Sequence, residues 1–184
     1  EDLFPDLRRH KDDLITSFMN GSYRPTPVRR VEIPKAGGKK RGLCIPTVVD
    51  RLVQQSISQV LLPIYEPHFE DSSYGFRPQR GAHQALEKAI YYLNAGYVYC
   101  VNFALEKFFD TVSHSKLIDL LSRTIKDSRV ISLIHKYLNA GVVVTGKYER
   151  TTGGVPQGGP LSPLLSNIML NEMDKELSRR GHPY

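Results

Sequence analysis

Two acidic side chains, Glu106 and Asp110, follow a run of β-branched and aromatic residues at positions 97–103. This composition is typical of a buried strand, and we predict that the strand ends near Ala104. In α/β proteins the end of a central strand holds reactive groups at the mouth of a cleft. Hard metal ions prefer carboxylate oxygens in such a place. Ala104, a small apolar residue, occupies the position where a carboxylate would make chemical sense.

A cationic hairpin is predicted between residues 28 and 45. Two strand-like runs, 28–33 and 41–45, flank the turn residues Gly37 and Gly38. Basic residues gather at the tip of this hairpin: Lys35, Lys39, Lys40 and Arg41. A Lys offers a phosphate a point charge and an Arg offers a bidentate fork. A plain solvated turn is the alternative interpretation.

The most specific string in the chain is PQGGPLSP at residues 156–163. Its two glycines let the backbone approach a ligand closely. Ser162 can cap a helix that has Pro163 in its first turn and apolar residues at helical spacing through Leu177. The alternative is a generic glycine turn before a helix.

The other elements that must position these groups are mostly helices. Apolar residues recur at helical spacing in four further stretches: 3–19, 50–62, 81–93 and 115–138, the last holding two helices. We expect Pro63 to stop the second helix. A second hairpin is predicted at 142–152, leading into the glycine string.

An irregular linker with the sequence SSYGFRP occupies residues 72–78. Tyr74 or Phe76 could stack on a base, because single-strand binders use aromatic faces in this way. Arg77 could contact a template phosphate or ribose. The alternative is that both aromatic rings only pack the loop against the core.

Composition and charge narrow the class of protein. The chain has 184 residues, is 40% hydrophobic and carries a net charge of +6, so it can bury one sizeable core and suits an acidic partner such as nucleic acid. A basic protein without such a partner is the alternative. Cys44 and Cys100 lack CxxC spacing and indicate reduced cysteines in a cytosolic protein. No apolar run is long enough for a membrane span, and no secretory signal is visible.

Three strings carry a resemblance to a known family: LEKFFDTV at 105–112, SYGFRP at 73–78 and PQGGPLSP. They resemble the reverse transcriptases, or maturases, encoded by group II introns, and the likeness is strongest over residues 33–181. Motif A of that family reads roughly D-hydrophobic-D-L-E-K-F-F-D-x-V. Its second Asp, which holds the catalytic Mg²⁺ ions, falls on Ala104, and its first falls on Asn102. Two such ions, roughly 4 Å apart, would activate the primer hydroxyl and stabilise the leaving pyrophosphate.

The resemblance assigns site residues by position. The catalytic positions are Ala104, in place of the metal-binding Asp, and Phe109, the gate that rejects a ribose 2′-hydroxyl unless it is plain core. The nucleotide-binding positions are Lys40, Arg41, Leu105, Gln157 and Gly158. The RNA-binding positions are Lys35, Tyr74, Phe76 and Arg77. The backbone carbonyl of Leu105 would assist the metal, so the implied Mg²⁺ site is incomplete in this chain.

The resemblance also implies an α+β fold: the fingers and partial palm of a right-hand polymerase, with an antiparallel sheet and packed helices. We expect N-terminal extension helices at 1–24, fingers with part of the palm at 25–96, and a partial palm at 97–184 that ends before the YADD motif. Residue 104 is expected at a sheet edge, across a cation-lined trough from the glycines at 158 and 159.

The function implied is RNA-directed DNA polymerase and intron maturase of a mobile group II intron. Its partners would be the intron RNA, an RNA template with a DNA primer, and dNTP, with a homodimer left open, in the bacterial cytoplasm and without a membrane. We expect this chain as written to be inactive as a polymerase, whether Ala104 is engineered or natural. The alternatives are a non-catalytic RNA-binding splicing cofactor and another bacterial reverse transcriptase: retron, diversity-generating or CRISPR-associated.

Overall fold

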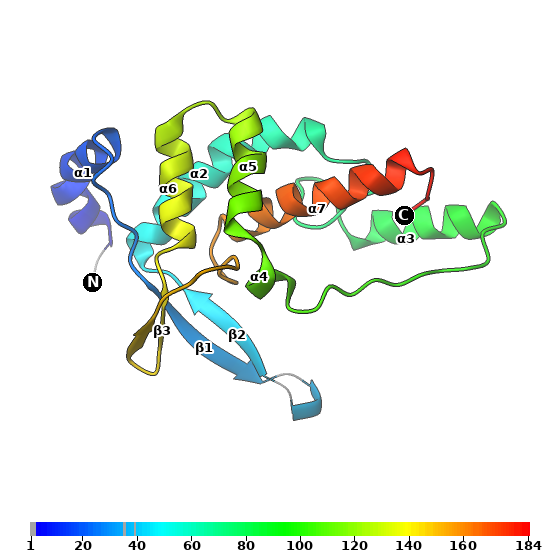
Figure 1. The fold of residues 1–184 in the computed structure, drawn as a ribbon, viewed down its shortest axis with the longest axis horizontal. Helices are drawn as coiled ribbons and strands as arrows, with labels where there is room; N and C mark the ends of the chain where they lie inside the picture. Colours follow the sequence, from blue (N-terminus) through cyan, green and yellow to red (C-terminus); the bar gives the residue numbers. More distant parts are fainter. Residues whose placement is uncertain (1–2, 35, 39) are drawn as a thin grey trace.

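The chain folds as helices packed beside one small sheet (Figure 1), in a computed structural model that describes residues 3–34, 36–38 and 40–184. The helices are α1 (Leu3–Met19), α2 (Val48–Tyr65), α3 (Ala82–Asn94), α4 (Phe108–Thr111), α5 (His114–Thr124), α6 (Ser128–Leu138) and α7 (Ser162–Arg179). Two short 3-10 turns are η1 (Ala36–Gly38) and η2 (Glu66–His68). The strands are β1 (Val28–Pro34), β2 (Lys40–Ile45), β3 (Val142–Val144) and β4 (Lys147–Glu149). The predicted α+β class is confirmed.

The main core lies among α2, α5, α6 and α7. Each presents an apolar stripe, and burial of these stripes is the main force that holds the helices together. The most deeply buried apolar side chains are Leu117, Leu121, Ile134, Leu138 and Leu161. The helix α2 continues to Tyr65 through Pro63, so the expected stop at that proline is wrong. Pro63 lies near the C-terminal end of α2, where few residues follow it within the helix.

The sheet has the order β2-β1-β3-β4. The predicted hairpin is confirmed: β1 pairs antiparallel with β2, with Arg30 opposite Cys44, and Gly37 in the turn has φ of 80°. The second hairpin, β3 with β4, is also antiparallel. However, β1 and β3 run parallel, so the sheet is mixed rather than wholly antiparallel. Parallel pairing is possible because a long helical crossover separates these two strands in sequence.

The segment of residues 97–105 is extended and exposed, not a buried strand (Figure 1). The side chain of Tyr99 is 92% exposed, and Val98, Val101 and Phe103 are also exposed. The prediction of a central strand here is therefore wrong. A buried strand needs a neighbouring strand for its backbone and a layer over its apolar side chains. The described part of the chain supplies neither to this segment.

A buried carboxylate fastens the N-terminal region to the helices. Asp50, 1% exposed near the start of α2, accepts hydrogen bonds from the hydroxyls of Tyr23 (2.7 Å), Tyr137 (3.2 Å) and Thr47 (2.6 Å). The main-chain N–H of Thr26 donates to Oδ2, the same oxygen that accepts from Thr47, at 3.2 Å, whereas the two tyrosines donate to Oδ1. Burial raises the pKa of both tyrosines. These contacts hold the connector after α1 against α2 and α6.

Among the described residues, no helix is both long and apolar enough to cross a membrane.

Candidate functional site

The hairpin β1–β2 lies directly against the glycine string. The side chain of Arg41 donates from Nε to Oε1 of Gln157 at 3.1 Å, and the main-chain N–H of Cys44 donates to the carbonyl of Gln157 at 2.6 Å. Gln157 is therefore held by both its side chain and its backbone. Three predicted nucleotide-binding residues are thus brought together, although more than a hundred positions separate Arg41 from Gln157 and Gly158 in sequence.

The glycines of this string are required by protein packing. Gly158 has φ of 116°, and a Cβ there would lie 2.5 Å from the carbonyl oxygen of Cys44. At Gly159 a Cβ would lie 2.4 Å from Oε1 of Gln54. The close approach that we expected toward a ligand is thus made, in the described structure, to β2 and α2. The predicted cap is also different: the Ser162 hydroxyl donates to the carbonyl of Pro156 at 2.6 Å, and Leu161 is at the N-cap of α7.

The residues just before the glycine string hold α4. The N–H of Val155 donates to the carbonyl of Phe109 at 2.6 Å, and the N–H of Gly154 donates to that of Val112 at 2.8 Å. The buried His114 bonds to the carbonyl of Gly154 at 2.7 Å through Nε2, which is the donor because a carbonyl only accepts. Sequence reasoning missed His114. Its position at the start of α5, directly after Ser113 at the N-cap, was the available signal.

Phe109 is half-buried and packs against the main core. Its ring lies 5.6 Å from that of Phe108 in an edge-on arrangement. The half-exposed ring fits both a ribose gate and plain core, so its role as a ribose gate stays a prediction.

Ala104 and Leu105 lie in the exposed segment before α4, so the expected placement of residue 104 at a sheet edge is wrong. The nearest acids in sequence are Glu106 and Asp110, and Asp110 is within 4.0 Å of the guanidinium of Arg30. Within the described residues, no group of three His, Cys, Asp or Glu side chains is arranged to hold a metal ion. The residues present do not fit the Mg²⁺ pair that the resemblance implies, because the carboxylate at 104 is missing.

The cations of the hairpin have mixed surroundings. Lys40 forms an exposed ion pair with Glu32 at 2.7 Å, which raises the pKa of Lys40 and lowers that of Glu32. Arg30, missed by sequence reasoning, crosses β2 beside Gly42 and reaches toward α4. Lys35 and Lys39 lie outside the described residues.

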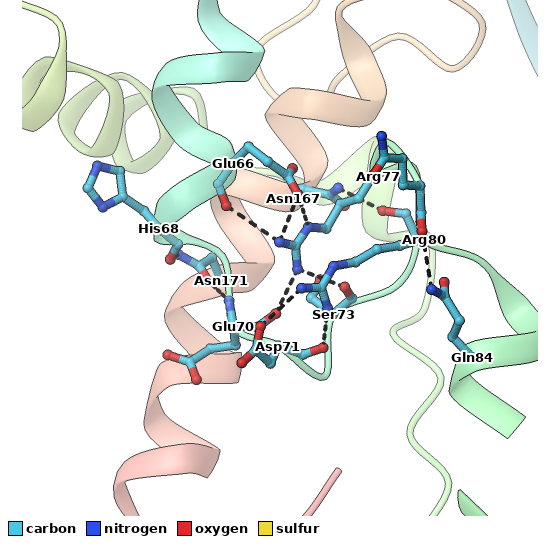
Figure 2. Close-up of polar contacts among 12 residues, drawn as sticks. Glu66, His68, Glu70, Asp71, Ser73, Arg77, Arg80, Gln84, Asn167 and Asn171 are labelled. Atoms are coloured by element: carbon cyan, nitrogen blue, oxygen red, sulfur yellow. Dashed lines mark hydrogen bonds and ion pairs between the residues drawn. The ribbon is translucent and has the colours of Figure 1, made fainter. Parts of the chain in front are cut away.

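The linker after η2 gives its three predicted RNA-binding residues different exposures, and Figure 2 shows the surroundings of one of them, Arg77. Phe76 is exposed, Tyr74 is partly buried, and the side chain of Arg77 is only 3% exposed. The guanidinium of Arg77 is turned inward to Glu66 and to main-chain carbonyls, so it has no free face toward a template. A polar groove of about 750 Å³ lies beside the linker, lined by Tyr74, Arg80, Lys88 and Tyr91 among others.

The chain belongs to the reverse transcriptase (RNA-dependent DNA polymerase) family, whose pattern matches residues 33–182. Within that family, it is 47% identical over 163 residues to the group II intron-encoded protein LtrA of Lactococcus lactis subsp. cremoris, covering 88% of this chain and 27% of the relative. It is 42% identical over 167 residues to the protein YkfC of Escherichia coli (strain K12), covering 89% of this chain and 44% of that one. It is 43% identical over 164 residues to an uncharacterized 91 kDa protein in the cob intron of Schizosaccharomyces pombe, covering 89% and 20%.

A solved structure shares the fold. A chain of a partial Cas6-RT-Cas1–Cas2 complex superposes with a TM-score of 0.62 at 22% identity, covering 97% of this chain and 31% of that chain. At that identity the likeness establishes the fold alone. The chain spans from a fifth to less than half of the length of the three relatives named above.

Proposed function

We propose that this chain forms the fingers (25–96) and partial palm (97–184), preceded by an N-terminal extension (1–24), of a group II intron-encoded reverse transcriptase and maturase. The observation that carries the proposal is the contact of Arg41 with Gln157, which joins the cationic hairpin to the glycine string. The similarity to the group II intron-encoded protein of L. lactis supports the same assignment. The partners of this protein would be intron RNA, an RNA template with a DNA primer, and dNTP. A bacterial cytoplasmic location is part of the proposal, and a homodimer is left open.

The proposed nucleotide site uses the junction between the hairpin and the glycine string. Lys40 and Arg41 would meet the triphosphate of dNTP, because an ammonium and a guanidinium both bind phosphate oxygens. Gln157 and Gly158 would lie beside the incoming nucleotide, with Phe109 as the ribose gate. Lys35, Tyr74 and Phe76 would contact the RNA. No chemical step is assigned to a metal ion, because the residues present do not fit one.

A non-catalytic RNA-binding splicing cofactor is the second candidate. The observation that favours it is Ala104, which leaves this chain without the carboxylate that metal-dependent nucleotidyl transfer requires. RNA binding depends on the cationic surface rather than on that carboxylate, so binding survives its loss.

Two measurements separate these functions. Binding of the 184-residue chain to a structured group II intron RNA is expected to weaken steeply as salt rises, because phosphate contacts release counterions. Primer extension with Mg²⁺ is expected to be absent for this chain. In a chain lengthened to match the relatives, the Ala104→Asp variant is expected to extend a primer. Tight RNA binding without extension by that variant would establish the splicing cofactor instead, and no RNA binding by either chain would contradict both.

A further inference from the structure

The guanidinium of Arg77 donates hydrogen bonds to several main-chain carbonyls of its own loop (Figure 2). Its Nε and Nη2 lie 2.9 and 2.8 Å from Oε1 of Glu66. Its Nη1 donates to the carbonyls of Glu70 (2.7 Å) and Ser73 (2.8 Å), and the ring of Phe69 lies 5.4 Å from its central carbon. The charge is balanced by Glu66 and the donors are used internally. An arginine in this state is a structural fork rather than a phosphate ligand.

The same loop is fastened from the other side by α7. The amide of Asn167 donates to the carbonyl of Gly75 at 2.8 Å, and the amide of Asn171 donates to the carbonyl of His68 at 3.0 Å. Both asparagines are buried. The helix that begins at the glycine string therefore also holds the residue that directly precedes Phe76.

Phe76 is presented outward by this loop. Its side chain is 70% exposed, and its φ of 56° is a conformation that bulky L-residues rarely adopt. An exposed aromatic ring on a strained residue persists only where the surroundings hold it, and such strain gathers at functional sites. The polar groove that starts at Tyr74, two residues before Phe76, has cations next to aromatic rings, with Glu66 and Glu87 also in its lining: Arg80 lies over Tyr74, and Lys88 over Tyr91.

We propose that Arg77 is a positioning residue that, with Asn167, holds Phe76 ready to stack on an unpaired nucleobase of a single-stranded nucleic acid. The inference rests on the proposed function, and it specifies how the loop that carries Phe76 would bind a nucleic acid. Arg77 itself does not touch the nucleic acid. Arg80, which lines the groove, carries the phosphate contact: it is paired with Asp71 at 3.0 Å, but the carboxylate of Asp71 is fully exposed, so a phosphate can compete for the guanidinium.

The absence of tryptophan from this sequence allows a direct test. Phe76→Trp places a single indole at the ring position, and a stacked base quenches its fluorescence. The probe is an unstructured oligoadenylate RNA of about 12 nucleotides, within the site size of single-strand binders. The parent Phe76→Trp chain is compared with four versions that add Arg77→Lys, Asn167→Ala, Arg80→Ala or Arg129→Lys. The last changes the exposed ion pair between Arg129 on α6 and Asp127 at the N-cap of that helix, and it is the control for a general loss of an arginine.

Without RNA, Arg77→Lys and Asn167→Ala are expected to lower the anisotropy of the indole while circular dichroism stays unchanged, because Lys keeps the charge but not the fork. With RNA, both are expected to remove most of the quenching at saturation and to weaken binding about tenfold. Neither is expected to change the slope of log K against log salt. Arg80→Ala is expected to keep the quenching and to lower that slope by about 0.7, the value for one phosphate contact on a single strand.

Different outcomes overturn different claims. Unchanged anisotropy in Arg77→Lys and Asn167→Ala, measured without RNA, overturns the positioning role whatever the chain binds. Binding to RNA that is weakened by Arg77→Lys, with both the free-state anisotropy and the quenching intact, makes Arg77 a direct ligand of the nucleic acid and also overturns the positioning role. RNA binding by the parent without quenching removes Phe76 as the stacking residue. Altered anisotropy with no RNA binding by any version leaves the positioning geometry standing and contradicts both the nucleic-acid ligand and the proposed function.

Discussion

The main-chain N–H of Cys44 in β2 donates a hydrogen bond of 2.6 Å to the carbonyl of Gln157 in the glycine string. This bond lies on the outer edge of the sheet, since β2 is an end strand. The string thus takes the place of a further strand over one residue. The glycine next to Gln157 is needed because the two backbones approach so closely there.

Replacing Gly158 by Ala is expected to lower the free energy of unfolding by about 2–4 kcal/mol. Part of this loss is the strain of a Cβ at positive φ, and part is the overlap with the carbonyl of Cys44 and the side chain of Leu43. Urea denaturation followed by circular dichroism measures the loss. The control is Gly146→Ala, which has φ of 82° and no atom within 4 Å of the added Cβ, so it should cost only about 1 kcal/mol. Equal losses at the two sites would show that the string does not pack on β2.

Replacing Asp50 by Ala is expected to lower the free energy of unfolding by about 2–3 kcal/mol. The change leaves the hydroxyls of Tyr23, Tyr137 and Thr47 without their shared acceptor inside the protein. Tyr23→Phe removes one donor and keeps the acceptor, so it should cost about 1 kcal/mol. Thermal and urea unfolding give both values. A loss below that of Tyr23→Phe would contradict the role of Asp50 as the common acceptor.

Stability is expected to fall as the pH rises above about 10, the ordinary pKa of a tyrosine. Burial raises the pKa of Tyr23 and Tyr137, so the folded state keeps these phenol protons after the unfolded state has lost them. Their contribution is therefore complete below pH 10 and is lost as the pH rises from there toward the folded-state values. Urea midpoints at pH 9 and pH 11 measure the fall. A variant with Tyr23→Phe and Tyr137→Phe should show a smaller fall between these two values, and an equal fall would contradict the assignment.

The two cysteines are expected to differ in their reactivity toward an alkylating reagent. Cys100 is exposed in the segment after α3, whereas Cys44 is buried in β2, where burial raises the pKa of its thiol. The thiolate is the reactive form, so iodoacetamide at pH 8 should add one group, at Cys100. Mass spectrometry locates the adduct. Cys100→Ser should leave the native chain unlabelled, and rapid labelling of Cys44 in that variant would show that the contact with Gln157 opens readily.

Local pattern predicted most of the elements. The glycine turn predicted the hairpin β1–β2, and helical spacing predicted α2, α3, α5, α6 and α7 to within a few residues, because both signals depend on neighbours in sequence. The strand expected at residues 97–103 was wrong for the same reason. Its composition suits a strand, but a strand exists only when another strand pairs with it.

For the candidate site as well, some residues could be predicted from local sequence and others could not. Sequence motifs alone proposed Arg41, Gln157 and Phe76 as site residues, because their types and neighbours are distinctive. Motifs also suggested an RNA contact for Arg77, and only its burial against Glu66 indicated an internal role. His114, Arg30 and Asn167 were missed altogether, since each acts through a partner on a distant element.

The sequence by itself determined the family resemblance, the order of helices and hairpins, and the absence of a carboxylate at position 104. These are properties of residue type and local spacing. The tertiary structure alone decided which groups meet: β2 with the glycine string, Asp50 with two distant tyrosines, and Arg77 with its own loop. Contacts of this kind depend on how far-separated segments pack, and burial then decides whether a charged side chain faces a ligand or the protein interior.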